Sequence, residues 1–418
     1  MKKTNIVSMV VLSLVMGGVA AQPLVPHVAY AAEKAKTFTH KEVATPAQEA
    51  QALMQQKKWK EAIDKLEGAN KVANKTPFET YVVNLFLFQC YASVQDTANA
   101  VKSFETSQAS GEMDAATAST ITKQIMGSYY GAKNYPKAIE YAQKILKDSP
   151  NDADTLLIVA QANYLQSNYK GTVEGAKAAI KVAQASGKPP TESLLGLWMS
   201  ADYKLENNVG VIAALEQLVT LYPKEDYWRD LVRLNQVALK GGSTKTNLDV
   251  AMIKSYLGLM KSSDEYIDAA QLALQEGLPG TAKALMESGV KAGVLGQGAS
   301  KDRETRLLTM ATTQAKTDEG SLAKGVSEAS NQKTGDALVK FGEAYASYGQ
   351  YDKAVETIQA GITKTPTNAD DAKLRLGIAY IQGGKRQQGL DAFKGITAGT
   401  PSAQVARLWS LASGYKKA

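Results

Sequence analysis

The sequence predicts an all-α protein, a solenoid of antiparallel helix pairs, on three grounds: its composition, an internal period of 34 residues and regularly placed prolines. Alanine, leucine, lysine and glutamine dominate, and only 12 prolines interrupt 418 residues, which is a helix-forming mixture. A chain of this length could also form two or three ordinary domains, but a period that runs along it favours one extended array.

The first 31 residues have the pattern of a secretory signal peptide. Lys2 and Lys3 precede an apolar stretch over residues 6–21, and small residues flank Tyr30. This order of positive, apolar and small residues predicts cleavage after Ala31. The alternative is an uncleaved membrane anchor, which needs about 20 consecutive apolar residues.

The residues that follow favour cleavage. Gln22 and Pro23 end the apolar stretch early, and residues 32–42 read as a flexible lead-in. No cysteine lies near the cleavage site, so the usual bacterial lipid anchor is not expected. We therefore expect a periplasmic protein, exported by a cleavable signal peptide, with no stable membrane anchor after cleavage.

A six-residue phrase with an aromatic second residue and an isoleucine or valine as its sixth residue recurs along the chain. Two copies, Asn134–Ile139 and Asn168–Val173, begin 34 residues apart, and others lie at 58–63 and 350–355. Each copy separates two amphipathic stretches, which predicts a short turn and then the second helix of a hairpin. Prolines that end or separate helices recur at Pro150, Pro223, Pro366 and Pro401.

These residues resemble the tetratricopeptide repeat, whose pattern has a small eighth residue, an aromatic eleventh, Ala twentieth, an aromatic twenty-fourth and Pro thirty-second. The best copy is residues 335–368, with Ile358 departing at the aromatic twenty-fourth place. The next, residues 370–403, has Gly389 in place of the alanine. The matching residues are Tyr91, Ala100, Phe104, Tyr129, Ala138, Pro150, Gly342, Tyr345, Ala354, Pro366, Gly377, Tyr380, Phe393 and Pro401.

A single hairpin cannot bury its apolar face alone, so neighbouring hairpins stack. The resemblance implies that the stacked array forms a right-handed superhelix with a concave inner surface. It covers about residues 43–403. We expect an N-terminal array over 43–295, irregular at 227–261, and a polar, partly helical connector over 296–333. A C-terminal repeat pair with a capping helix at 402–415 completes the chain, within 334–418.

The charge pattern argues against nucleic-acid binding. The formal net charge is +7, or +5 without Lys2 and Lys3, and basic residues are spread out rather than clustered. No Lys/Arg run is longer than the pair Lys416-Lys417.

Few residues suit catalysis or metal binding. After signal cleavage the only histidine is His40, and Cys90 is the only cysteine, so neither a catalytic triad nor a zinc site is expected. Cys90 lies in an apolar run and is predicted to be buried. The glycines of residues 293–298 lack the strand and Lys-Ser/Thr of a phosphate-binding loop, and predict a helix-ending loop. We expect no enzyme and no cofactor, with a hidden site in 296–333 as the remaining catalytic alternative.

Three acidic pairs need an explanation. Asp152/Asp154, Asp264/Glu265 and Asp370/Asp371 could suggest glycoside hydrolysis, which uses two facing carboxyl groups. All three lie where a first helix begins, so N-capping and favourable interaction with the helix dipole explain them better.

The family's groove-facing positions indicate a partner-binding surface of tyrosines and amides. The residues at these positions are Gln89, Gln124, Tyr130, Gln161, Tyr164 and Tyr203, with Gln271 in a later repeat. Such residues suit an extended peptide or partner helix, but the tyrosines could equally pack between helices. The basic clamp of some members is missing, with Lys123 the only cation at the corresponding positions of two repeats.

The leading hypothesis is a non-catalytic periplasmic scaffold that binds a protein or peptide of an envelope complex through its concave groove. Residues 266–280 and 292–296 resemble a segment of exported bacterial repeat proteins, some associated with energy-coupled outer-membrane transport. The alternative is a peptidoglycan- or glycan-binding envelope protein, suggested by the tyrosines, amides and acidic pairs.

Overall fold

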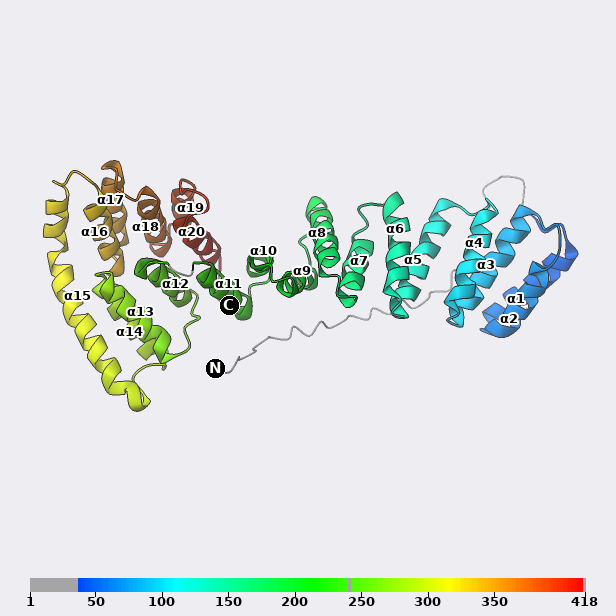
Figure 1. Cartoon of the computed structure of the whole chain (residues 1–418), viewed down its shortest axis with the longest axis horizontal. Helices are drawn as coiled ribbons and strands as arrows, with labels where there is room; N and C mark the ends of the chain where they lie inside the picture. Colours follow the sequence, from blue (N-terminus) through cyan, green and yellow to red (C-terminus); the bar gives the residue numbers. More distant parts are fainter. Residues whose placement is uncertain (1–36, 240–241, 416–418) are drawn as a thin grey trace. The chain divides into compact units, whose positions relative to one another are not determined.

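The chain folds into helices joined by short turns (Figure 1). The structure, a computed structural model, describes residues 37–239 and 242–415, and no strand occurs within these ranges. The predicted signal peptide lies outside the described residues. By contact density the chain divides into an N-terminal unit that ends at Asn207 and a C-terminal unit that begins at Asn208.

The N-terminal unit is a run of helices in which each packs on the next. Its successive helix pairs share small cores of alanine, leucine, isoleucine and aromatic side chains. The helices are α1 (Lys41–Gln55), α2 (Trp59–Asn70), α3 (Pro77–Ser93), α4 (Thr97–Ala109), α5 (Ala115–Gly131), α6 (Tyr135–Asp148), α7 (Ala153–Leu165), α8 (Tyr169–Ala185) and α9 (Glu192–Lys204).

One turn geometry joins the helices of each pair, and it explains the recurring phrase. Lys133 and Ser167 have positive φ angles of 59° and 61°. The N–H of the next residue donates to the carbonyl five residues back, from Asn134 to Tyr129 at 2.9 Å and from Asn168 to Asn163 at 2.9 Å, which is the Schellman pattern. The Asn134 and Asn168 side chains then cap the following helix, so each phrase begins a second helix as predicted.

The residues just before α1 are held to α3, unlike the flexible lead-in that the sequence suggested. The fully buried Glu79 accepts hydrogen bonds from the backbone N–H groups of Thr39 at 2.8 Å and His40 at 2.7 Å, and its Oε2 lies 2.7 Å from His40 Nδ1. Burial acts to raise the pKa of Glu79, but hydrogen bonds from Thr76, His40 and Thr39 outweigh it and lower the pKa to about 2.

Two glycines in the C-terminal unit show why the eighth residue of the repeat is small. A Cβ at Gly342 would press on Ile358, and a Cβ at Gly377 would overlap the Phe393 ring. Close approach of the two helices of a pair therefore requires glycine there. Around these contacts Tyr345, Ala354 and Phe393 are buried, as the repeat pattern predicts.

The C-terminal unit continues the pairing but contains one exceptional helix. Its helices are α10 (Asn208–Leu221), α11 (Glu225–Ala238), α12 (Thr244–Tyr256), α13 (Ser263–Gln275), α14 (Pro279–Lys291), α15 (Lys301–Ala329), α16 (Asp336–Ser347), α17 (Tyr351–Thr363), α18 (Ala369–Gln382), α19 (Arg386–Phe393) and α20 (Pro401–Ala412), with a short 3₁₀ helix, Gly298–Ser300, before α15. Figure 1 shows α15 as the long helix beside α13, α14 and α16.

The segment expected to be a connector is α15, a 29-residue helix. It packs against both α14 and α16 and buries Ala311, Ala315 and Leu322. Residues 296–333 are thus an integral part of one compact unit, and the division of the chain lies at 207/208 instead. The polar sequence obscured this because a helix with a narrow stripe of small apolar residues needs few apolar side chains to pack.

The last helices of the C-terminal unit return to its first helices. Helix α20 packs on α10, α12 and α18. Gln404 Nε2 donates to Asn235 Oδ1 at 2.9 Å, the Arg407 guanidinium pairs with Glu216, and the Trp409 ring lies 5.1 Å from that of Tyr256. The helix predicted at 402–415 therefore does more than cap the last repeat: it closes the unit on itself.

Candidate functional site

Three of the predicted groove residues come together in the N-terminal unit. The Tyr130 hydroxyl on α5 donates to Gln161 Oε1 on α7 at 3.4 Å, and Tyr164 follows Gln161 by one helical turn. Both tyrosine rings also make edge-on contacts within their own hairpins, Tyr130 with Tyr135 at 5.7 Å and Tyr164 with Tyr169 at 5.5 Å. We call Tyr130, Gln161 and Tyr164 the tyrosine–glutamine surface.

This surface combines packing with exposure. Tyr130, Gln161 and Tyr164 are all partly buried, and burial raises the pKa of the Tyr130 hydroxyl, so it remains a neutral donor. Each tyrosine therefore braces the turn of its hairpin and still presents part of its ring to solvent, which is the amphipathic use expected of tyrosine.

The remaining predicted groove residues lie apart from this surface. Gln89 on α3 and Gln124 on α5 are partly buried, and Tyr203 on α9 is 55% exposed. Within residues 37–239, no described hydrogen bond or ring contact joins these three side chains to the tyrosine–glutamine surface. Gln271 lies on α13, in the C-terminal unit.

Lys123, the cation at a clamp position, is already paired. Its Nζ lies 2.5 Å from Asp152 Oδ2, and Asp152 also caps α7 by accepting from the Thr155 N–H at 2.9 Å. Burial acts to raise the pKa of Asp152, but bonds from Lys123 and Thr155 lower it overall. The Asp152 carboxylate thus caps a helix, as predicted for the Asp152/Asp154 pair.

The other acidic pairs divide between two roles. Glu265 completes a capping box with Ser262 at the start of α13. At the start of α18 the cap is Asn368, whose side chain accepts from the Asp371 N–H at 3.0 Å. Asp371 itself is therefore no cap: it belongs to a charged cluster that the sequence did not reveal.

That cluster surrounds Arg375 inside the C-terminal unit. The guanidinium donates to both oxygens of Asp249, the Nη2 contact measuring 2.7 Å, and it lies 2.9 Å from Asp371 and 3.3 Å from Glu343. Lys245 lies 2.8 Å from Asp371 and 3.2 Å from Glu343. Three carboxylates thus face two cations, which leaves one negative charge in excess.

Ionisation of the cluster follows from its geometry. Burial raises the pKa of Asp249, but a carboxylate whose two oxygens both accept from one guanidinium is in its ionised form. Burial likewise acts to lower the pKa of Arg375, and the three carboxylates outweigh it, so the pKa rises well above the ordinary value. The side chains of Arg375 and Asp249 are 6% and 7% exposed, so removing either partner would strand a buried charge.

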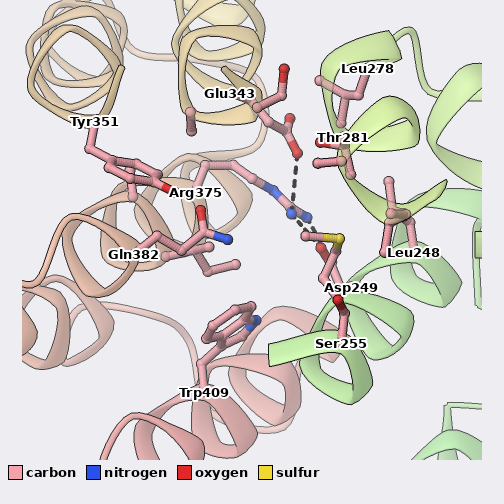
Figure 2. Close-up of a pocket in the computed structure, with 17 residues that line it drawn as sticks. Leu248, Asp249, Ser255, Leu278, Thr281, Glu343, Tyr351, Arg375, Gln382 and Trp409 are labelled. Carbon is pink, nitrogen blue, oxygen red and sulfur yellow. Dashed lines mark hydrogen bonds and ion pairs between the residues drawn. The ribbon is translucent and has the colours of Figure 1, made fainter. Parts of the chain in front are cut away.

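The cluster forms one wall of a cavity of about 180 Å³, shown in Figure 2. Helices α12, α14, α16, α17, α18 and α20 contribute to its lining. Apolar side chains include Leu248, Met252, Leu285 and Ile378, and polar ones include Ser255, Thr281, Tyr351 and Gln382. Trp409 lies across the cavity from Glu343, below Gln382 (Figure 2).

Trp409 stands on the α20 side of this cavity. Its ring is fully buried, and Nε1 has no hydrogen-bond partner. Buried donors are almost always paired, so an unpaired one calls for an explanation. Because the whole ring is buried, Nε1 presents no surface to the cavity, and the charged wall formed by the Arg375 cluster is what makes the cavity a second candidate site.

No family model matches the sequence, and no curated protein matches it. Among solved structures, a tetratricopeptide repeat protein of Parabacteroides merdae is 12% identical, covering 65% of this chain and 100% of its own, with a TM-score of 0.32. The tetratricopeptide domain of P58(IPK) is 16% identical over 84% of this chain and 98% of its own, with a TM-score of 0.25. A yeast Sti1 structure, titled as a complex of its TPR2AB domain with pHSP90, is 14% identical over 71% and 99%, with a TM-score of 0.24.

The fold assignment rests on the chain's own geometry. The helices follow one another in pairs. The same Schellman turn recurs between the helices of a pair, with Tyr91 the acceptor in an early hairpin and Tyr380 in a late one. Glycines lie at the close helix contacts, and all three features fit the repeat pattern. The fold is a tetratricopeptide-repeat-like helical array. The repeat numbering places Tyr130 and Gln161 at corresponding positions of successive hairpins, and the structure brings these two side chains into contact; their role in binding a partner stays a prediction.

The same numbering missed the Arg375 cluster. A signal existed, since Arg375 and Asp249 each stand between apolar residues on a helix, where a charge needs a partner. The partner could not be named, because 126 residues separate the two. Among the described residues, no helix is both long and apolar enough to cross a bilayer, and no group of three or more His, Cys, Asp or Glu side chains is placed to hold a metal ion.

Cys90 and the glycine-rich loop agree with the sequence-based expectations. Cys90 is fully buried, and burial raises the pKa of its thiol to about 12, which suits a packing role. Gly293, Gly296 and Gly298 have positive φ angles between α14 and α15, so they form a loop that ends α14.

Proposed function

We propose that this protein is a non-catalytic scaffold that binds a protein or peptide of the bacterial cell envelope through the tyrosine–glutamine surface. The observation that supports this most is the Tyr130–Gln161 contact, which joins the first helices of two successive pairs and aligns partly exposed rings and amide groups. Rigid aromatic area next to hydrogen-bonding groups is typical of protein-binding hot spots.

The proposal includes export. The signal-like residues 1–31 would direct the chain to the periplasm and be removed after Ala31, leaving a scaffold available to an envelope complex. An association with energy-coupled outer-membrane transport belongs to the same proposal and rests on the resemblance of residues 266–280 and 292–296 to exported repeat proteins. Mass spectrometry of the purified protein tests the first step, which predicts a mature N-terminus at Ala32.

Site-directed photo-crosslinking in cells tests the binding surface. A Tyr164→p-benzoylphenylalanine variant should give a discrete protein adduct, which mass spectrometry identifies. The matched control places the same residue at Lys181, which is exposed on the second helix of that hairpin. Equal adducts from both positions, or none from Tyr164, would count against this surface.

Purified components then separate a protein partner from a glycan. The partner found by crosslinking should bind the wild-type protein and lose at least tenfold in affinity with the Tyr130→Ala, Tyr164→Ala double variant, since aromatic hot spots contribute 2 kcal/mol or more. If instead the wild-type protein sediments with cell-wall glycan and the double variant does not, the glycan-binding alternative replaces the proposal.

A further inference from the structure

In the N-terminal unit, the turns that follow three first helices lie along one edge. Tyr130 on α5 contacts Gln161 on α7, and α7 packs on α9, so these helices lie side by side. The second helices α6 and α8 run back against α5 and α7, so the first helices are parallel and their C-terminal ends meet at the same edge. We call residues 131–137, 165–171 and 203–207 the turn edge.

The exposed apolar side chains of this unit gather on the turn edge. Within residues 37–207, the large apolar or aromatic side chains that are exposed are Leu165, Tyr203 and Leu205, with exposed fractions of 46%, 55% and 36%. A single exposed leucine is ordinary in a soluble protein. All three side chains of this kind, however, stand at the ends of the neighbouring helices α7 and α9, which indicates a surface that contacts something apolar.

The turn edge is also basic. Each of its three turns contributes an exposed lysine for which no ion pair is described within residues 37–207, namely Lys133, Lys170 and Lys204. Glu206 is the only carboxylate in these turns. At the opposite edge, where one hairpin is linked to the next, Asp114, Asp148 and Asp154 are exposed. A negatively charged surface would therefore attract the turn edge more strongly than the opposite edge.

We propose that the turn edge docks on the surface of a lipid bilayer that carries anionic headgroups. The lysines lie among the headgroups in this arrangement, and Leu165, Tyr203 and Leu205 enter the boundary between headgroups and acyl chains. A bilayer fits better than an acidic protein, because the apolar anchors are spread over separate turns and a bilayer needs no matching shape. The docking uses no residue of the tyrosine–glutamine surface, so it goes beyond the proposed protein binding.

Sedimentation of the mature full-length protein with lipid vesicles tests the proposal. Vesicles of phosphatidylcholine and phosphatidylglycerol in a ratio of about 3:2 should bind it at least tenfold more tightly than vesicles of phosphatidylcholine alone at about 0.1 M NaCl. Raising the salt to about 0.5 M should weaken the binding, because it screens the lysines from the headgroups. No binding to the anionic vesicles, or equal binding to both kinds, would overturn the proposal and would leave the crosslinking test at Tyr164 unaffected.

Charge-matched variants locate the docking edge. Changing Lys133, Lys170 and Lys204 together to Gln should weaken binding to the anionic vesicles at least tenfold, since each lysine near such a surface contributes about fivefold. The control changes three exposed lysines at the opposite edge to Gln and removes the same charge: Lys71, Lys147 and Lys188. It should alter the affinity by less than about threefold. Equal losses in the two triple variants would show that net charge, and not this edge, drives the binding.

A fluorescent label tests whether the apolar anchors enter the bilayer. Cys90 is fully buried, so a thiol-reactive, polarity-sensitive dye will label an introduced surface cysteine. The dye on Gln166→Cys, beside Leu165, should brighten and shift to shorter wavelength with anionic vesicles, and the dye on Asn151→Cys at the opposite edge should not. Leu165→Ser made together with Leu205→Ser should reduce the response at position 166. The same response at both positions, or none at 166, would contradict insertion of this edge.

An acidic protein as the occupant is the outcome to separate from a bilayer. A Tyr203→p-benzoylphenylalanine variant should give no discrete protein adduct in cells if the edge faces lipid. A discrete adduct at this position, together with failure to bind anionic vesicles, would replace the bilayer with a protein partner.

Discussion

The two units are built from the same hairpin and differ in how far their contacts reach along the chain. In the N-terminal unit each helix packs mainly on its neighbours in sequence, with core clusters that span one or two pairs. In the C-terminal unit α18 and α20 contact α12, and ion pairs join residues 126 and 191 positions apart. Repeat arrays with only neighbour contacts unfold piecewise, whereas long-range closure couples distant helices. We therefore expect the C-terminal unit to unfold as one block and the N-terminal unit to open locally.

The largest expected effect comes from breaking the closure. Asp249→Ala leaves the buried Arg375 without its bidentate partner and should lower the free energy of unfolding of the C-terminal unit by about 3–5 kcal/mol. Urea unfolding monitored by hydrogen exchange would measure the free energy of unfolding of each unit separately. Asp230→Ala, which removes an exposed partner of Arg233 in the same unit, should cost less than about 1 kcal/mol. Similar losses in both variants would mean that the cluster does not couple the helices.

The next effect concerns the close helix contacts. Gly377→Ala places a methyl group against the Phe393 ring and should destabilise the C-terminal unit by about 1–3 kcal/mol, the usual cost of overpacking. The shift of the urea midpoint of that unit provides the measurement. A Phe393→Leu change made together with Gly377→Ala should recover part of the loss. If the single glycine variant is as stable as the wild type, the α18–α19 pair is less tightly packed than the structure indicates.

In the N-terminal unit a local, pH-dependent loss is expected at α1. The pKa of Glu79 is lowered from 4.5 to about 2, so the stabilisation it provides is present above pH 4.5 and is lost as the pH falls toward 2. Amide protection factors, which correct for the intrinsic pH dependence of exchange, should therefore fall in residues 39–55 over this range before they fall in α7 and α8. Glu79→Gln should weaken α1 at neutral pH and flatten its pH dependence. Simultaneous loss of all N-terminal helices would contradict the local opening proposed for this unit.

The smallest effect runs in the opposite direction. Gly127 lies within α5, and a Cβ there would meet no atom within 4 Å, so Gly127→Ala should stabilise the N-terminal unit by about 0.5–1 kcal/mol through helix propensity. Chemical denaturation monitored in the isotope-labelled N-terminal unit of the full chain would detect it. A destabilisation would show that this position, unlike Gly377, is misjudged as open.

What the sequence could predict follows from the range of the contacts. The hairpin phrases around Tyr135 and Tyr169, the buried Cys90 and the Tyr130–Gln161 proximity depend on residues within one or two repeats, where a 34-residue period fixes their relation. The Arg375–Asp249 pair and the burial of Trp409 depend on helices that meet only after the chain has returned, and no period encodes that return. The integration of α15 was missed for a related reason, since alanines such as Ala311 and Ala315 form its buried stripe and look unremarkable in a polar sequence.

The closure by α20 also limits how this protein can change in length. A neighbour-stacked array can gain or lose a hairpin at its end, because the new terminal pair finds the same docking face as the old one. In the C-terminal unit that face is occupied: α20 lies against α10 and α12, and Arg407 is paired with Glu216. Duplication of a repeat between α16 and α19 would move α20 away from those helices and break its contacts with them. The number of hairpins there is therefore fixed by geometry, whereas the N-terminal unit is free to vary.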